Sequence, residues 1–250
     1  MTSKRTLGSP LIRMGSVTST MDIARHLDNH GAVEGTTVIA ASQTHGRGRA
    51  DRTWNSPAGA GLYCSILLRP QLPAEQFQPF SIAAGLAICE ALDPGNRIGL
   101  QLKWPNDILY QGRKLGGVLF TTAVSGPIVT SAVLGFGLNL RLDPTHPNTS
   151  IALEAVLEIS HQLLICPEHC ILSAISTRYT QLTSGENPAI ADWPARLAFL
   201  GDHVIIQEGR STASGILRAL DFEGALILHT PAGERRITSG ELTRGPRLTR

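Results

Sequence analysis

The sequence has little cysteine. The cysteines are too few and too scattered for the disulfide framework of a small secreted domain: they are Cys64, Cys89, Cys166 and Cys170. Residues 1–16 contain no apolar segment as long as the core of a signal peptide. We therefore expect a cytoplasmic protein whose thiols are reduced.

The sequence also has little net charge. Its 250 residues carry 22 Lys and Arg against 20 Asp and Glu, a formal charge of +2, which argues against a surface that binds nucleic acid or anionic lipid throughout. An apolar fraction of 42% with only 17% charged residues excludes a disordered chain. The length allows one large domain, or one large domain and a small one.

One segment, from Leu115 to Leu140, has no charged residue and is long enough to cross a membrane. The turn-forming sequence Ser125-Gly126-Pro127 interrupts it, and the residues on both sides are rich in β-branched types. Two buried strands joined by a tight turn explain this pattern better than a membrane helix does. We expect no membrane partner.

Apolar periodicity and turn residues predict helices and strands over most of the chain. The expected helices span residues 19–31, 77–92, 151–164 and 167–182, and the expected strands span residues 36–42, 62–68, 98–102, 108–110 and 115–120. Gly and Pro mark a break at residues 185–188, and short strands separated by glycine follow from about Gly201. This pattern predicts a large domain of residues 1–198 and a small β-barrel of residues 199–250.

The most informative loop runs from Gly46 to Trp54, in which Arg47, Arg49 and Arg52 lie close to glycines. Glycine lets the backbone approach a ligand closely, and arginine offers a fork of donors that matches carboxylate and phosphate oxygens. The pattern therefore indicates an anionic, phosphate-bearing ligand. By itself it is equally typical of a solvated loop or of a tract that binds nucleic acid.

Three further motifs follow this loop. Lys103-Trp104-Pro105-Asn106-Asp107 comes at the end of a predicted strand, where the ligand sites of α/β proteins gather. The next two motifs are Lys114-Leu115-Gly116-Gly117-Val118-Leu119 and Gly135-Phe136-Gly137-Leu138-Asn139. The four segments in this order resemble the biotin protein ligases, and the resemblance extends from Ser19 to Glu241.

The resemblance implies an α+β fold: a mixed sheet with helices, similar to class II aminoacyl-tRNA synthetases, followed by a small SH3-like barrel. It implies an enzyme that activates biotin with MgATP to biotinyl-5′-adenylate and then transfers biotin to one lysine of a biotin carboxyl carrier protein. Long members of the family carry an N-terminal helix-turn-helix. The 18 residues before Ser19 are too few to form one, so we expect no DNA binding. An exposed edge strand would allow a homodimer or docking of the carrier protein.

Residues that match the family's motifs are expected to form the site. The expected biotin contacts are Ser19, Thr20, Gln43, Arg47, Gly48, Arg49, Lys103, Trp104 and Gly117. The expected adenylate contacts are Arg49, Arg52, Trp54, Asn106 and Asn139, and Lys103 and Arg49 are expected to act in catalysis. No metal held by the protein is expected, because the spacing of His161, Cys166, His169 and Cys170 departs from that of zinc sites.

The implied chemistry accounts for these residue types. Carboxylic acids titrate near pH ~4, so the biotin carboxylate is ionised at neutral pH and attacks the α-phosphate of ATP without a base. The two anions do need cations between them: Lys103 at the carboxylate and α-phosphate, Arg49 and Arg52 on phosphate oxygens, and Mg²⁺ on the pyrophosphate. For the transfer step, Asp107 is the nearest candidate base for the incoming lysine.

Alternatives remain open for several residues. Ser19 and Thr20 are equally suited to cap a helix, and Trp104 suits the core as well as it suits a biotin wall. Asp51 stands where the family often has glycine, and an ion pair with a neighbouring arginine would hold the loop in shape. For the whole protein, the alternatives are a lipoate or octanoate ligase or transferase of the same fold and a non-catalytic biotin-binding module.

Overall fold

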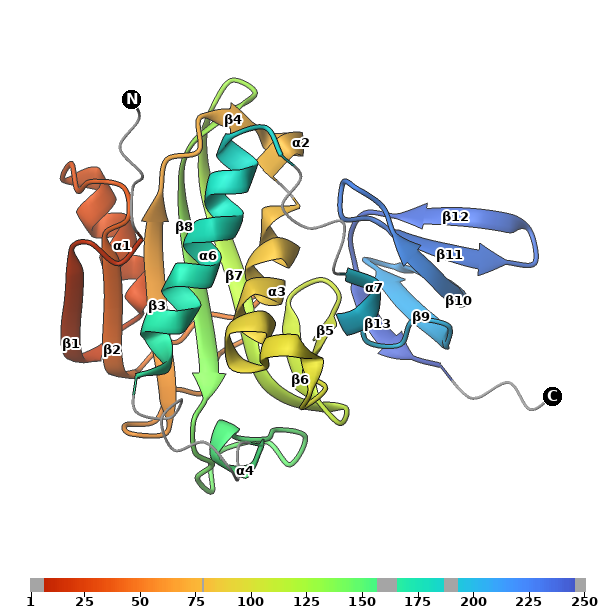
Figure 1. The fold of residues 1–250 in the computed structure, drawn as a ribbon, viewed down its shortest axis with the longest axis horizontal. Helices are drawn as coiled ribbons and strands as arrows, with labels where there is room; N and C mark the ends of the chain where they lie inside the picture. The colour runs from red at the N-terminus through yellow and green to blue at the C-terminus, as the bar shows by residue number, and fades with distance from the viewer. Residues whose placement is uncertain (1–6, 78, 157–165, 187–192, 246–250) are drawn as a thin grey trace.

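The computed structural model describes residues 7–77, 79–156, 166–186 and 193–245. It contains a large sheet covered by helices and, after the short helix α7 (Trp193–Arg196), a smaller sheet at the C-terminal end (Figure 1). The prediction of an α+β fold is therefore confirmed. No helix within the described ranges is long and apolar enough to cross a membrane.

The large sheet has the strand order β1-β2-β3-β8-β7-β6-β5, and the short strand β4 pairs with β8. Its strands are β1 (Leu11–Val17), β2 (Thr37–Gln43), β3 (Gly61–Leu68), β4 (Leu72–Pro73), β5 (Gln101–Lys103), β6 (Asp107–Tyr110), β7 (Arg113–Ser125) and β8 (Ile128–Asn139). The sheet is mixed: β1 runs parallel to β2, whereas the other described pairs are antiparallel. The helix α1 (Thr20–Asn29) supplies the crossover that a parallel pair requires.

The central strands explain the longest apolar runs of the sequence. β3 and β8 lie side by side and are buried along almost their whole length. The uncharged segment from Leu115 to Leu140 forms the β7–β8 hairpin, in which Ser125 pairs with Ile128, so the prediction of two joined strands is confirmed. β1 is not predicted by the sequence, because its residues 13–16 are exposed and show no apolar alternation.

Helices cover both faces of the large sheet. α3 (Phe80–Leu92) and α6 (Pro167–Thr183) lie side by side on one face, where Ile66 and Leu68 of β3 join the main core (Figure 1). α1 packs on the other face, where Met21 and Leu67 belong to one buried cluster. Successive residues of a strand alternate between the two faces, so β3 contributes to both cores.

The predicted helices over residues 19–31 and 167–182 are confirmed as α1 and α6. The helix predicted over residues 77–92 is present as α3, which begins three residues later; a separate short helix, α2 (Ala74–Phe77), precedes it, and a short 3-10 helix follows at Pro94–Asn96. The helix predicted over residues 151–164 is described only at α4 (Leu153–Val156); residues 157–164 lie outside the described ranges.

The smaller sheet is antiparallel, with the order β12-β11-β10-β9-β13. Its strands are β9 (His203–Glu208), β10 (Ser211–Leu220), β11 (Leu226–Thr230), β12 (Gly233–Ile237) and β13 (Glu241–Arg244). Val204, Ile206, Leu217, Leu226 and Leu228 are fully buried and form the centre of its core. The short apolar strands predicted from the sequence after Gly201 are therefore present.

Two buried contacts join the sheets. The Trp104 indole N–H donates to the carbonyl of Gly224 at 2.9 Å, and Arg196 of α7 forms a buried ion pair with Asp93 at 3.0 Å. Asp93 also accepts hydrogen bonds from the backbone N–H groups of residues 98–100. Burial by itself would raise the pKa of Asp93, but the hydrogen bonds and Arg196 outweigh it and hold the pKa below the usual range.

Candidate active site

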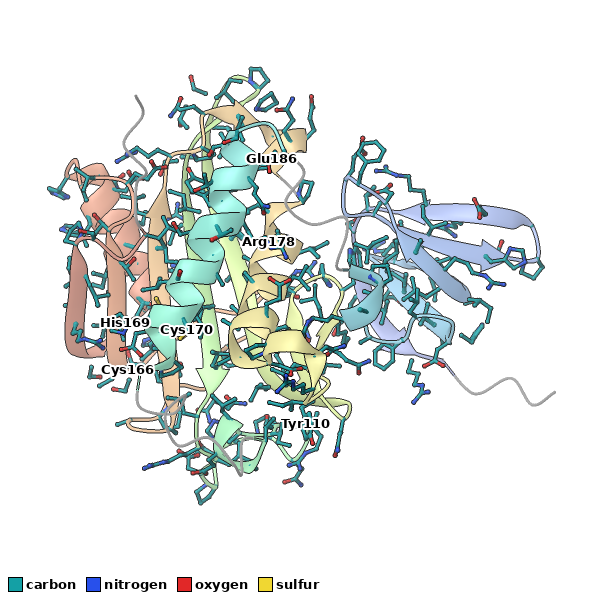
Figure 2. All side chains as sticks on the ribbon, in the orientation of Figure 1. Tyr110, Cys166, His169, Cys170, Arg178 and Glu186 are labelled. Carbon is teal, nitrogen blue, oxygen red and sulfur yellow. The ribbon has the colours of Figure 1, made fainter. Side chains whose placement is uncertain are left out.

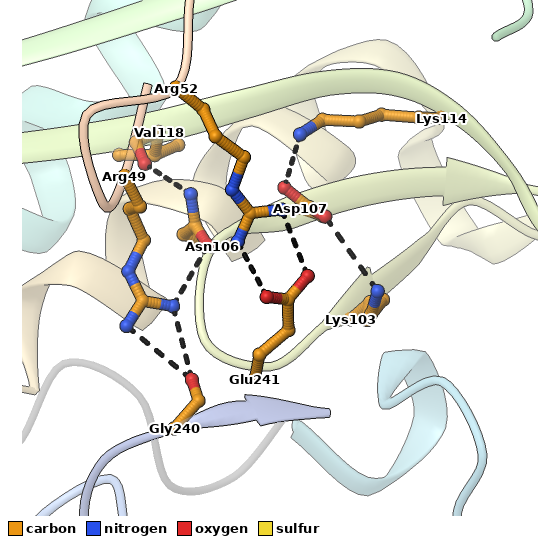
Figure 3. Close-up of polar contacts among 9 residues, drawn as sticks. All are labelled: Arg49, Arg52, Lys103, Asn106, Asp107, Lys114, Val118, Gly240 and Glu241. Carbon is orange, nitrogen blue, oxygen red and sulfur yellow. Dashed lines mark hydrogen bonds and ion pairs between the residues drawn. The ribbon is translucent and has the colours of Figure 1, made fainter. Parts of the chain in front are cut away.

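One cavity gathers residues from segments far apart in the sequence. Its lining comes from the start of α1, the arginine loop (Gly46–Trp54), the turn between β5 and β6, strands β7 and β8, and the start of β13. The smaller sheet therefore forms one side of a cavity whose other sides belong to the large sheet. Figure 3 shows the polar contacts on that side.

The start of α1 gives the cavity a neutral, polar end. Ser19 occupies the N-cap position, but its side chain makes no capping hydrogen bond. The residue is fully buried, and its Oγ has no hydrogen-bond partner among the described residues. Beside it, the N–H and Oγ1 of Thr20 donate to Gln43 Oε1 at 2.8 and 3.1 Å. A buried unpaired hydroxyl costs about 1–3 kcal/mol, so the Ser19 Oγ would gain from a polar group placed in the cavity.

Backbone hydrogen bonds close the arginine loop into a hairpin, and residues 50–53 at its tip are exposed. Gly48 N–H donates to the carbonyl of Arg52 at 2.7 Å, and Trp54 N–H donates to the carbonyl of Gly46 at 2.9 Å. Asp51 lies at the tip with a φ angle of 56°. It makes no ion pair with any described residue, so the alternative in which it pairs with a neighbouring arginine is not realised.

Arg52 holds the smaller sheet through a two-point ion pair with Glu241 (Figure 3). The two nitrogen–oxygen distances are 2.9 and 2.6 Å. The hydrogen bonds raise the pKa of Arg52 and lower the pKa of Glu241. Because both side chains are about half exposed, water screens the pair and it contributes little to stability. Its importance is its position at the mouth of the cavity.

The other two arginines are held differently. Arg47 pairs with Asp22 of α1 at 2.6 Å. Within the described ranges, Arg49 makes only long hydrogen bonds, at 3.4 Å to Asn106 Oδ1 and at 3.4 and 3.5 Å to the carbonyl of Gly240. Burial lowers the pKa of Arg49, although an arginine stays protonated at neutral pH. A half-buried guanidinium with such weak partners is well placed to bind an anion.

Asp107 lies between two lysines (Figure 3). Its Oδ1 is 2.6 Å from Lys114 Nζ and its Oδ2 is 4.0 Å from Lys103 Nζ. Lys114 Nζ also lies 5.2 Å from the centroid of the Trp54 ring, within range of a cation–π contact. The sequence does not single out Lys114 as a site residue. The β6–β7 register, which pairs Asp107 with Gly117, places it there, and a register is not visible in a motif.

The Trp54 indole packs directly on the backbone of β8. A Cβ atom on Gly137 would lie 2.5 Å from Trp54 Nε1, so only glycine leaves room for the ring. The Nε1 atom is buried and has no hydrogen-bond partner among the described residues. Like the Ser19 hydroxyl, it is a polar atom at the cavity that the described residues leave unsatisfied.

Two family sequence models match this chain. One, for the biotin/lipoate A/B protein ligase family, matches residues 14–139, and the other, for the biotin protein ligase C terminal domain, matches residues 199–242. This chain belongs to the biotin protein ligase family. The ligase is 36% identical to the biotin–[acetyl-CoA-carboxylase] ligase of Paracoccus denitrificans, over 82% of this chain and 88% of that protein. It is 32% identical to the bifunctional ligase/repressor BirA of Bacillus subtilis, over 96% of this chain and 75% of that protein.

Solved structures agree with this assignment. The ligase resembles the biotin protein ligase of Aquifex aeolicus, solved in complex with biotin and ATP, with a TM-score of 0.77 and 27% identity. The likeness covers 94% of this chain and 98% of the Aquifex chain, so it includes both sheets.

All but one of the ligase's predicted site residues line the cavity. They are Ser19, Thr20, Gln43, Arg47, Gly48, Arg49, Arg52, Trp54, Lys103, Trp104, Asn106 and Gly117. Trp104 fits both readings of its role, since it is only 3% exposed and also forms part of the cavity wall. Asn139 is the exception: its amide donates to the carbonyls of Lys114 and Ile151, both at 3.2 Å, and ties two backbone segments together.

Proposed function

We propose that this ligase activates biotin with MgATP to biotinyl-5′-adenylate and pyrophosphate, and then transfers biotin to a lysine of a biotin carboxyl carrier protein. The observation that carries the proposal is the division of the cavity. Ser19, Thr20 and Gln43 suit a neutral ring with hydrogen-bonding groups. Lys103 and Arg49 suit a carboxylate and a phosphate.

In the first step, the biotin carboxylate attacks the α-phosphorus of ATP, an oxygen–phosphorus bond forms, and pyrophosphate leaves. Lys103 supplies a compact positive charge, and Arg49 supplies planar donors for phosphate oxygens. Their charges offset the repulsion between the two anions and stabilise the negative charge that develops in the transition state. Both groups line the cavity and have only weak partners among the described residues, so neither has to break a strong ion pair before it meets the substrates.

Arg52 reaches a phosphate only after it leaves Glu241, because its donors are occupied by that carboxylate. Phosphate and carboxylate oxygens compete for the same guanidinium fork. Asp107 and Glu241, the carboxylates of the described cavity lining, are both paired with cations. The residues present therefore fit a Mg²⁺ ion that is carried on the phosphates of ATP rather than in a cage of protein oxygens.

In the second step, the ε-amine of the carrier lysine attacks the carbonyl of the adenylate, an amide forms, and AMP leaves. The amine must first lose a proton, because the ordinary pKa of lysine is about 10.4. Asp107 is the proposed acceptor, since its carboxylate lines the cavity. The rest of the rate acceleration of this step comes from the carrier protein, which positions the amine next to the adenylate carbonyl.

Biotin-dependent exchange of pyrophosphate with ATP, measured on the purified chain, tests the first step, and biotinylation of an added carrier domain tests the second. Exchange with lipoate or octanoate but not with biotin would favour the acyl ligase alternative. Biotin binding without exchange would favour the non-catalytic alternative. Binding of neither biotin nor ATP would overturn the proposal.

A methyl group on Gly137 should push the Trp54 indole into the cavity. Gly137→Ala is therefore expected to weaken binding of biotinyl-adenylate in calorimetric titrations and, by the usual cost of overpacking, to lower the free energy of unfolding by about 1–3 kcal/mol. Gly15→Ala is the matched control, because a Cβ at Gly15 meets no atom within 4 Å. Equal affinities of the two variants would contradict the assigned role of Trp54.

The proposal includes the finer properties of the enzyme. The carrier belongs to a biotin-dependent carboxylase, the setting is the cytoplasm, and neither DNA nor a membrane is a partner. Residues 1–198 form the catalytic domain and residues 199–250 the SH3-like domain. Gel-shift assays at physiological salt test the expectation on DNA, and sedimentation of the full chain distinguishes a homodimer from a monomer.

A further inference from the structure

The start of α6 gathers metal-binding side chains outside the cavity. Cys166, Glu168 and His169 each offer one ligand atom, and these atoms lie within 4.8 Å of one another. Figure 2 shows Cys166 and His169 together at one end of α6, with Cys170 close by. None of these residues lines the candidate active site. The cluster therefore needs an explanation other than biotin ligation.

The local sequence explains why these side chains meet. Pro167 occupies the first turn of α6, and Cys166 is the residue before the helix. Cys166 and His169 are three residues apart, a spacing that brings side chains onto one face of a helix. Glu168 is almost completely buried, with 6% of its surface exposed. The cluster thus has one carboxylate fixed by the protein and two ligands at the surface.

Arg13 of β1 fixes that carboxylate. Its guanidinium donates to Glu168 Oε1 at 2.6 Å. A carboxylate has two oxygens, so one oxygen remains for another partner. A ligand carboxylate that is oriented by a second hydrogen bond is typical of protein metal sites. Arg13 also offsets part of the negative charge that a thiolate and a carboxylate bring to one place.

We propose that Cys166, Glu168 and His169 bind Zn²⁺ or a divalent cation of similar softness. A thiolate, an imidazole and a carboxylate are the donors that zinc takes in proteins. Bond lengths of about 2.0–2.3 Å place the ligand atoms of a tetrahedral site about 3.3–3.8 Å apart. Side-chain rotations that move each ligand atom by roughly 1 Å would therefore bring the three atoms to tetrahedral positions. Binding displaces one proton from the Cys166 thiol, and a water occupies the fourth position.

Cys170 is the natural alternative to that water. It is exposed and lies four residues after Cys166, about one helical turn further along the same face of α6. A second thiolate would make the site softer and tighter. A loss of Zn²⁺ affinity when Cys170 is replaced therefore indicates four protein ligands, and an unchanged affinity indicates three.

Cobalt titration of the reduced, chelator-treated full-length chain tests the proposal. Co²⁺ should bind at one equivalent, with a thiolate-to-metal charge-transfer band and the intense visible bands of a tetrahedral site, and Zn²⁺ should displace it. Cys166→Ser should abolish the charge-transfer band. It should also weaken Zn²⁺ binding by more than about 100-fold, since loss of even an outer-shell partner costs about 10–100-fold.

Matched variants separate this site from unspecific binding. His169→Asn should weaken Zn²⁺ binding as Cys166→Ser does, whereas His229→Asn, which changes an exposed histidine of β11, should leave it unchanged. Biotin-dependent exchange should be the same in all three variants, because the cluster lies outside the cavity. A wild-type protein without the charge-transfer band, or a Cys166→Ser variant that binds Zn²⁺ normally, would overturn the proposal.

Discussion

Replacement of Lys103 by alanine should lower the rate of biotin-dependent ATP–pyrophosphate exchange by about 10²–10³-fold, equivalent to about 3–4 kcal/mol of transition-state stabilisation. Lys103 ends β5 at the cavity, and its Nζ lies 4.0 Å from Asp107, too far for a strong ion pair. Its charge is therefore available to the substrates. The chain contains only three lysines, and two of them, Lys103 and Lys114, lie in this cavity.

The Lys103 variant should fold normally, because the side chain is only partly buried and makes no short hydrogen bond. Thermal unfolding and circular dichroism should therefore match those of the wild type. Lys103→Arg, which keeps the charge but changes its reach, should retain more exchange activity than Lys103→Ala. Near-normal exchange by the alanine variant would contradict the proposed role of this charge.

Asp93→Asn should lower the free energy of unfolding by about 3–5 kcal/mol, the usual cost of leaving one partner of a buried ion pair uncompensated. Asp93 and Arg196 are 1% and 5% exposed, so water cannot replace the lost charge. The NH2 group of the asparagine would also face other hydrogen-bond donors, because Asp93 accepts hydrogen bonds from the backbone N–H groups of residues 98–100 in the wild type. Urea unfolding at neutral pH measures the loss.

The same carboxylate should make stability depend on pH. The pKa of Asp93 is lower in the folded protein than in the unfolded chain. The stabilisation that ionised Asp93 gives to the folded protein is therefore fully present above the unfolded-state pKa of about 3.9. It is lost as the pH falls through the lower pKa of the folded state. The stability difference between wild type and Asp93→Asn should shrink over that acidic range.

Asp51→Asn is the matched control for Asp93→Asn. Asp51 is exposed, has no ion pair with the described residues, and has a positive φ angle that asparagine tolerates well. The substitution should change the free energy of unfolding by less than about 0.5 kcal/mol. Equal losses in the two variants would mean that the buried pair is not what stabilises the junction between the sheets.

The sequence predicts which residues line this cavity where they are consecutive. The Gly46–Trp54 loop and the turn that starts at Lys103 each keep several lining side chains within one short segment, so a motif locates them together. The buried strands are also predictable, because their apolar runs and the turn at Ser125 are local signals. β1 cannot be predicted in this way, because its exposed residues show no apolar pattern that is typical of a strand.

Contacts between distant segments are the part that the sequence does not predict. Glu241 meets Arg52 only because β13 pairs with β9 and the smaller sheet then lies against the arginine loop. Asn139 lies two residues after Gly137 on the same face of β8, yet its amide is held at the end of the strand by the carbonyls of Lys114 and Ile151. Such outcomes depend on register and packing, which a motif does not contain.

The bond from the Trp104 indole to Gly224 has a thermodynamic consequence. Trp104 belongs to the cavity wall, whereas Gly224 belongs to a turn of the smaller sheet. A ligand that holds Trp104 in place therefore also favours the conformation in which the two sheets are docked. The free energy of ligand binding is distributed over both sheets, and saturation with ligand should melt them as one cooperative unit at a higher temperature.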